Sequence, residues 1–171
     1  MKVPTIWTIG HSTRPIGEFI DALNAHGITR VVDVRRFAGS RAFPQFNPPA
    51  LERSLARAGI TYSALPELGG RRRPSPSSPH TAWRNEAFRG YADYMDTPEF
   101  RTGADALAGL ATDDRVAVMC AEAVWWRCHR SMIADYFKAA GWTVLHIQGM
   151  GEAKEHPYTS VARVQNGRLT Y

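Results

Sequence analysis

The sequence of 171 residues has no long apolar run and contains only two cysteines. No segment approaches the roughly 20 consecutive apolar residues that a membrane-spanning helix needs, and the first residues lack the apolar core of a secretion signal. We therefore expect a cytoplasmic protein that does not bind a membrane. Cys120 and Cys128 have no other cysteine to pair with, which excludes a secreted disulfide framework and predicts free thiols.

Lysine is also scarce, because the 21 basic residues comprise 18 arginines and three lysines. They outnumber the 16 acidic residues and give a formal net charge of +5. The planar fork of donors on arginine binds phosphate or carboxylate through paired hydrogen bonds. A GC-rich genome also raises the arginine total, so only the clustering of the arginines bears on function.

The apolar pattern predicts strands that alternate with helices in one α/β domain over residues 1–171. Short β-branched and apolar runs predict five strands, at residues 5–9, 31–34, 60–65, 115–119 and 142–147. Apolar residues at helical spacing predict helices after the first, second and fourth of these strands. This alternation is typical of a parallel sheet covered on both faces, so we expect a Rossmann-like three-layer fold with a five-stranded, mainly parallel sheet.

Two segments interrupt or follow this alternation. Residues 66–112, between the third and fourth strands, are expected to form a loop and a helical insert whose two helices break at Pro98. Within this insert, residues 71–79 hold three arginines followed by prolines and serines, a composition typical of an irregular loop. Residues 157–171 are expected to form a terminal β-hairpin, because Asn166-Gly167 is a strong turn signal.

Reactive side chains gather where the predicted strands end. Ligands of open parallel sheets bind outside the carboxyl ends of the strands, so residues there are candidates for a site. The candidates for catalysis are His11, Asp33, Cys120, Glu122 and Cys128. The candidates for ligand binding are Ser12, Arg35, Gly69, Gly70, His129 and Arg130. Loops at the opposite edge, such as residues 112–114, hold ordinary side chains, and this asymmetry itself indicates a site.

The segment from Cys120 to Arg130 is the most informative part of the sequence. Cys120 ends a predicted strand, and Cys128, His129 and Arg130 are expected to open the following helix. Helix N-termini stabilise anions and thiolates, so position makes Cys128 the better thiolate candidate. Cys120 is the better buried candidate, and a purely structural role as a small core residue remains an alternative for it.

Two further arrangements of these residues stay open. Cys120, Cys128, His129 and His11 could converge as the four ligands of a zinc site, but the sequence has no paired Cys-x-x-Cys knuckle, and a metal is not favoured. Cys128, His11 and Asp33 supply the residue types of a nucleophile triad, which spacing alone does not assemble. The sequence indicates neither a cofactor nor an oligomeric state.

The strand-end motifs also resemble a known family, the bacterial and archaeal domain of unknown function 488. The motifs that show this resemblance are, in order, residues 8–12 (Thr-Ile-Gly-His-Ser), 33–35 (Asp-Val-Arg), 65–70 (Leu-Pro-Glu-Leu-Gly-Gly), 120–122 (Cys-Ala-Glu) and 128–130 (Cys-His-Arg). The resemblance extends from about Thr5 to Tyr171 and implies a Rossmann-like α/β domain. It implies no activity, because the family is named for lacking one.

Three functional hypotheses follow from these residues. The first is an enzyme that acts on a phosphorylated ligand such as a nucleotide or nucleic acid. Arg35 and Arg130 would hold the anion, His11 or Glu122 would move protons, and a thiol would be the nucleophile or a ligand. The second is a non-catalytic nucleic-acid-binding module that uses the arginine loops and aromatic residues. The third is a thiol-redox or metal-binding protein.

The first hypothesis comes with an expected geometry. A strand order of 3-2-1-4-5 would place the first and fourth strands side by side where the order reverses. His11, Arg35, Cys120 and Arg130 should then surround one pocket within the roughly 300–1,000 Å³ that is usual for small-molecule sites.

Overall fold

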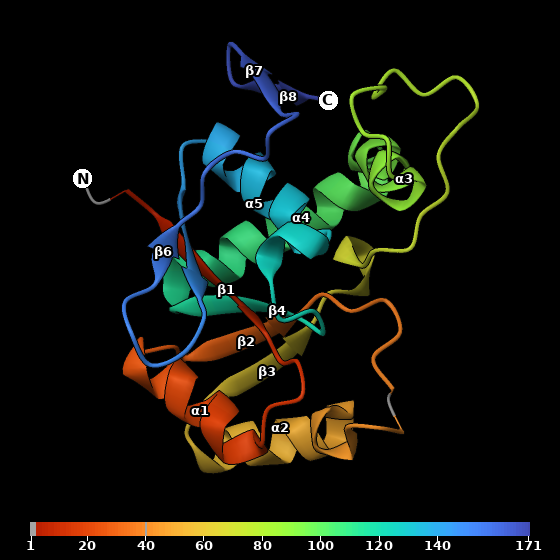
Figure 1. Cartoon of the computed structure of the whole chain (residues 1–171). Helices are drawn as coiled ribbons and strands as arrows, with labels where there is room; N and C mark the ends of the chain where they lie inside the picture. The colour runs from red at the N-terminus through yellow and green to blue at the C-terminus, as the bar shows by residue number, and fades with distance from the viewer. Residues whose placement is uncertain (1–2, 40) are drawn as a thin grey trace.

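A six-stranded sheet forms the centre of the protein (Figure 1), as seen in a computed structural model that describes residues 3–39 and 41–171. The strands are β1 (Thr5–Gly10), β2 (Arg30–Asp33), β3 (Thr61–Ala64), β4 (Val116–Cys120), β5 (Thr143–Ile147) and β6 (Lys154–Glu155). Their order is β3-β2-β4-β1-β5-β6. All pairings are parallel except that of β5 with the short strand β6.

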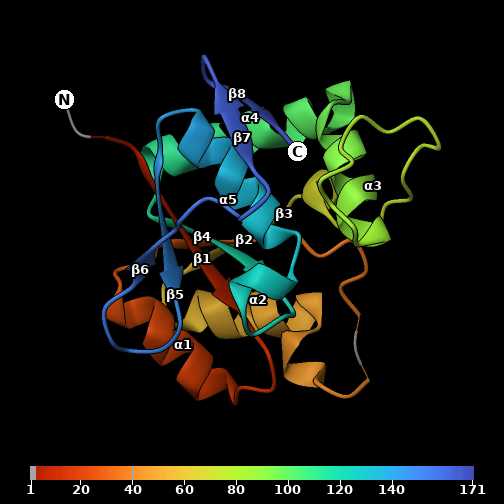
Figure 2. The same ribbon diagram turned by 45° about the horizontal axis from the view of Figure 1, so that its top comes forward.

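Helices cover both faces of this sheet, as Figures 1 and 2 show. The helices are α1 (Ile16–Ala25), α2 (Pro48–Arg57), α3 (Glu86–Met95), α4 (Pro98–Asp113) and α5 (Arg130–Ala139). On one face, α1 and α2 pack on side chains such as Ile9 and Val31. On the other face, α3, α4 and α5 pack on side chains such as Val32 and Val118. Neighbouring residues of one strand thus serve opposite cores, as the alternation of side chains along a strand requires.

This architecture confirms the expected Rossmann-like three-layer α/β fold, but the sheet has six strands and not the expected five, because the short strand β6 pairs with β5. The insert between β3 and β4 contains a loop followed by α3 and α4, which are interrupted just before Pro98. The terminal hairpin is formed by β7 (Arg163–Gln165) and β8 (Arg168–Thr170). Asn166 and Gly167 connect them with φ angles of 52° and 77°, as a two-residue turn with two positive φ angles requires.

The expected strand order 3-2-1-4-5 is wrong, because β4 lies between β2 and β1. Right-handed crossovers do not distinguish the two orders. In both, the chain moves from β1 to β3 with helices on one face and returns to β5 with helices on the other. The right-handed rule therefore determines in which direction along the sheet each new strand is added. It does not determine whether β4 lies between β2 and β1 or between β1 and β5. The fully buried, apolar β4 occupies the central gap, where it has a neighbour on each side.

The central position of β4 determines where the loops go. After β1 and β2 the chain turns to α1 and α2 on one face, whereas after β4 it turns to α5 on the other. When the connections that follow two adjacent strands run to opposite faces of the sheet, a crevice opens between them at the carboxyl edge. Because β4 has such a neighbour on both sides, the residues that follow it, 121–129, run between two openings.

The end of β1 lies directly against these residues. Gly10 pairs with Cys120, and an ideal Cβ on Gly10 would lie 1.8 Å from the carbonyl oxygen of Glu122. The backbone N–H groups of His11 and Ser12 donate hydrogen bonds to the carbonyls of Cys120 and Ala121, at 2.9 and 3.0 Å. The close approach of the two segments therefore requires glycine at position 10.

We predict that Gly10→Ala lowers the free energy of unfolding by at least about 2 kcal/mol, because the added methyl group forces the two backbones apart. Gly17→Ala is the matched control. Gly17 is exposed in α1 with open space around its Cα, so alanine there should be neutral or stabilising by up to about 1 kcal/mol. Urea denaturation measures both. Equal effects of the two substitutions would contradict the packing described here.

Candidate functional site

Two adjoining cavities open at the carboxyl edge of the sheet. The first, which we call the thiol pocket, has a volume of about 330 Å³ and is lined by both cysteines. The second, which we call the His11 pocket, has a volume of about 420 Å³. Both are bordered by Ala121, Glu122 and Arg35, so the segment after β4 separates them.

The sulfur atoms of Cys120 and Cys128 lie in contact at the base of the thiol pocket. The Sγ atoms are 2.9 Å apart, with Cys128 placed to donate its proton to Cys120. Both side chains are buried, and both cysteines are free thiols. The end of β4 supplies one sulfur, and the segment entering α5 supplies the other.

The two thiols differ in acidity. The hydrogen bond from Cys128 lowers the pKa of Cys120 to about 7, and the guanidinium of Arg130 acts in the same direction against the effect of burial. The pKa of Cys128 is raised, first because it donates that hydrogen bond and second because it is buried. Cys120 is therefore the more acidic of the two thiols in the folded protein, whereas position in the sequence favoured Cys128.

His129 completes the base of the thiol pocket. Its Nδ1 lies 3.4 Å from the sulfur of Cys128, and its Nε2 lies 3.3 Å from the carbonyl oxygen of Val34. Burial lowers the pKa of His129 to about 4, so the ring is neutral near pH 7. A neutral ring that donates from Nε2 to the carbonyl leaves Nδ1 as an acceptor, which makes His129 the base nearest to Cys128.

Arg130 is a buried cation that lines neither cavity. Its side chain is 2% exposed, and its Nη2 donates to the carbonyl of Ala123 at 3.4 Å. Its Nε and Nη1 are buried and have no hydrogen-bond partner among the described residues. A buried guanidinium without a carboxylate is costly unless another anion lies near it. Cys120, whose pKa Arg130 lowers, is the group that can supply that charge.

The His11 pocket is built around an ion pair. Arg35 donates from Nε and Nη2 to the two oxygens of Asp33, at 2.9 and 2.7 Å, and Asp33 also accepts from Tyr62 at 2.7 Å. The Nη1 of Arg35 lies 3.3 Å from Nε2 of His11, whose Nδ1 lies 2.8 Å from the carbonyl of Ser12. Both ring nitrogens of His11 are therefore occupied, and burial lowers its pKa.

The expectation of one pocket surrounded by four side chains is therefore wrong. His11 and Cys120 lie at the same edge but in different cavities, Arg35 borders both, and Arg130 is buried behind the thiols. The cause is the alternation of side chains along a strand. Cys120 is in register with Gly10, so the next residue, His11, turns toward the opposite face and stacks on Phe46.

The other candidate residues lie at the same edge. Ser12 lines the His11 pocket and has a positive φ of 51°. Glu122 is exposed where the two cavities meet. Gly69 and Gly70 allow close packing, because an added Cβ would lie 2.5 Å from Cβ of Arg36 and 2.8 Å from Nδ1 of His129, respectively.

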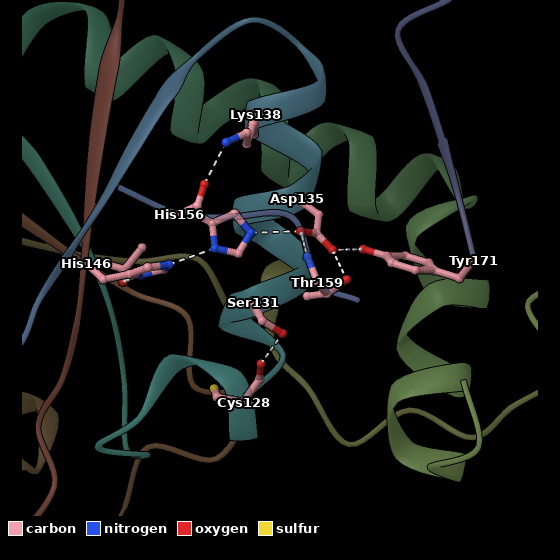
Figure 3. A network of polar contacts seen from close by, with 9 residues as sticks. Cys128, Ser131, Asp135, Lys138, His146, His156, Thr159 and Tyr171 are labelled. Atoms are coloured by element: carbon pink, nitrogen blue, oxygen red, sulfur yellow. Dashed lines mark hydrogen bonds and ion pairs between the residues drawn. The ribbon is translucent and has the colours of Figure 1, made fainter. Parts of the chain in front are cut away.

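A buried polar network holds α5 in place (Figure 3). The carboxylate of Asp135 accepts hydrogen bonds from the ring of His156 and the hydroxyl of Tyr171, each at 2.7 Å, and two from Thr159. The ring of His156 in turn lies 2.8 Å from His146 of β5. At the start of the same helix, Ser131 bonds the carbonyl of Cys128 at 2.8 Å. The network therefore fixes the helix that positions the second thiol.

Sequence reasoning did not assign two groups of residues in this region. The exposed arginines Arg36, Arg71 and Arg127 border the thiol pocket. The enzyme hypothesis assigned the anion to Arg35 and Arg130, and the sequence placed Arg36 and Arg71 only in the alternative nucleic-acid-binding surface. The Asp135 network was missed because an acidic residue within a helix usually faces solvent. A histidine inside the otherwise apolar strand β5 was the available signal.

The sequence left open a zinc site and a nucleophile triad built from these residues. Within residues 3–39 and 41–171, no group of three or more histidine, cysteine, aspartate and glutamate side chains is placed to hold a metal ion. The histidine beside Cys128 is His129, and His11 lies in the other cavity. Neither the four-ligand zinc site nor the triad of Cys128, His11 and Asp33 is formed.

The structure defines a Rossmann-like α/β domain, and comparison with known proteins shows the family to which this domain belongs. The family model described as "Domain of unknown function DUF488" matches residues 15–137, well over half of the chain. The protein belongs to the DUF488 family. No curated protein and no solved structure matches it. In the described part of the chain, no helix is both long and apolar enough to cross a bilayer.

The partly buried ring of His129 and the buried ring of His146 predict a loss of stability in mild acid. Burial lowers the pKa of His129 to about 4 and that of His146 to about 2, from an ordinary value of 6.5. Below pH 6.5 the unfolded chain takes up protons that the folded protein excludes, so stability is complete above this pH and is lost as the pH falls. Each histidine should account for about 2 kcal/mol between pH 7 and pH 5.

Urea denaturation at pH 7, 6 and 5 measures this effect, within a range where most carboxylates remain ionised. His129→Gln is the control, because it should remove about half of the pH dependence that these two histidines cause. An unfolding free energy that stays constant from pH 7 to pH 5 would show that these rings are not held neutral.

Proposed function

We propose that the protein is an enzyme that acts on a phosphorylated ligand, such as a nucleotide or nucleic acid, in the thiol pocket. The observation that supports this proposal most strongly is the position of the contacting thiols Cys120 and Cys128 below a rim of three exposed arginines. A nucleophile and a cationic rim in one cavity suit a ligand that has both a reactive centre and an anionic group.

The rim arginines are better anion ligands than Arg35 and Arg130, the two residues to which the enzyme hypothesis from sequence assigned the anion. Arg35 is already paired with Asp33, and Arg130 is buried behind the thiols. Arg36, Arg71 and Arg127 are exposed at the mouth, so their guanidinium groups can bind phosphate oxygens from solvent.

The walls of the thiol pocket fit the remainder of a nucleotide. Phe37, Phe88 and Tyr91 line it, and aromatic side chains of this kind stack on bases. A further cavity of about 590 Å³ continues from the rim along Arg71, Arg72 and other residues of the insert loop. A ligand with more than one phosphate could follow this positive surface away from the thiols.

The chemistry assigned to the site is nucleophilic substitution by Cys120. Its thiolate attacks the electrophilic atom of the ligand and forms a covalent bond to it. The bond to the leaving group breaks at the same time, and the leaving group takes the electron pair and a proton from water at the open mouth. Glu122, exposed at that mouth, is placed to guide this water.

A non-catalytic nucleic-acid-binding module is the second candidate function. It is favoured by the continuity of the arginine surface, in which Arg36 and Arg71 border both the thiol pocket and the 590 Å³ cavity. The two candidates differ in what they require of the thiols. Binding alone does not need Cys120, whereas the enzyme does.

We predict that phosphorylated compounds bind at the rim. Thermal shift with pyrophosphate, nucleoside mono-, di- and triphosphates and a single-stranded oligonucleotide should reveal at least one that raises the melting temperature. Arg71→Gln and Arg127→Gln should each weaken that binding about tenfold, the loss typical of one charge-assisted contact. Arg57→Gln is the matched control, since Arg57 is exposed at the end of α2 near the opposite edge of the sheet.

The role of the thiol is tested on the compound that binds best. Intact-mass analysis should detect either turnover or a covalent adduct in the wild type and neither in Cys120→Ser, which should still bind. Binding without turnover or adduct in both proteins would favour the non-catalytic module. If no compound in the panel binds, or if the rim variants bind as well as the control, the proposal is wrong.

A further inference from the structure

We propose that Cys120 and Cys128 form a reversible dithiol–disulfide pair that a hydroperoxide oxidises within the folded protein. This inference goes beyond the proposed function, because it concerns a reaction of the two thiols with an oxidant and needs no phosphorylated ligand. It rests on the contact of the two sulfurs, on their access to a cavity and on the buried cation beside them.

The two sulfurs are already close to bonding geometry. A disulfide needs its sulfurs at about 2.05 Å, so the pair at 2.9 Å has to close by less than about 1 Å. The two residues are eight positions apart, and the segment between them contains the short 3₁₀ helix η3 (Trp125–Arg127) and no strand of the sheet. The closing movement therefore falls on a loop, while Cys120 stays fixed at the end of β4.

The surroundings prepare one sulfur to react first. Among the described residues, the buried guanidinium of Arg130 forms no ion pair with a carboxylate, and two of its nitrogens have no hydrogen-bond partner. It therefore favours negative charge on the neighbouring sulfur. Cys128 donates its proton toward Cys120, and Nδ1 of His129 lies 3.4 Å from the Cys128 sulfur. Cys120 is thus the attacking thiolate and Cys128 the resolving thiol.

The reaction balances in two steps. In the first, the Cys120 thiolate attacks the outer oxygen of the hydroperoxide and the O–O bond breaks. The leaving group, an alkoxide or, from hydrogen peroxide, a hydroxide, takes a proton from water and leaves as an alcohol or as water. Cys120 is then a sulfenic acid. In the second, His129 takes the proton of Cys128, whose sulfur attacks the sulfenic sulfur. The S–S bond forms as the S–O bond breaks, and the released hydroxide takes the proton from His129 and leaves as water.

The same cation makes the disulfide easy to reduce. Oxidation removes the negative charge beside Arg130 and leaves its guanidinium buried without compensation. An uncompensated buried charge destabilises the oxidised form relative to the reduced form. The pair should therefore return to the dithiol state when a small dithiol reductant enters the thiol pocket.

The experiment treats the reduced, full-length protein with equimolar hydrogen peroxide at pH 7, blocks the remaining thiols and measures the intact mass. We expect one population of monomer that has lost two hydrogens, takes up no blocking group and yields a cross-linked Cys120–Cys128 peptide. Dithiothreitol should restore two reactive thiols. Cys128→Ser should stop at a sulfenic acid that dimedone traps, whereas Cys120→Ser should react at least about tenfold more slowly.

Two further variants test the role assigned to the cation. Arg130→Met should slow the oxidation about tenfold, and Arg130→Lys should retain most of the rate, because lysine keeps the charge. If Arg130→Met does not fold, the wild-type measurement decides alone. Two thiols that stay reduced, a disulfide between two chains, or oxidation of a single sulfur to sulfinic acid would each overturn the inference. None of these outcomes depends on whether a phosphorylated compound binds.

Discussion

The hydrogen bonding of β4 to β2 on one side and to β1 on the other is the constraint on which the site depends. It places the segment that connects β4 to α5 between the segment that connects β1 to α1 and the segment that connects β2 to α2. The segment after β4 therefore lies in the middle of the carboxyl edge, with a cavity on each side. Gly10 makes this placement possible, because a larger residue would collide with the carbonyl of Glu122.

The compensation of buried charge distinguishes the two cavities. In the His11 pocket, the charge of Arg35 is matched by Asp33, and the arrangement needs nothing more. The carboxylate of Asp135 is likewise saturated by neighbouring donors, which suits a structural role. Arg130 is the exception, since its guanidinium has no carboxylate and only one hydrogen bond among the described residues. Its nearest means of compensation is a thiolate, which is why we assign the chemistry to the cysteines.

Much of this arrangement could be predicted from sequence because it depends on local patterns. Alternating apolar runs predict the layers, and Asn166-Gly167 predicts the hairpin. The candidate residues could be assigned to one edge of the sheet, because loops at one end of a parallel sheet meet. Their division between two pockets could not, because it depends on the register of Cys120 with Gly10. The acidity of the thiols could not be predicted either, because it arises from contacts between residues that only the fold brings together.

The central claim is that the fold holds a thiolate on Cys120, and the pH dependence of alkylation tests it most directly. The wild-type protein is treated briefly with iodoacetamide from pH 5 to pH 10, and modification is measured separately for the two cysteine peptides. The account predicts that Cys120 is modified with a midpoint near its pKa of about 7 and that Cys128 stays unmodified until a much higher pH. Modification of Cys128 first, or of both cysteines only near pH 9, would contradict it.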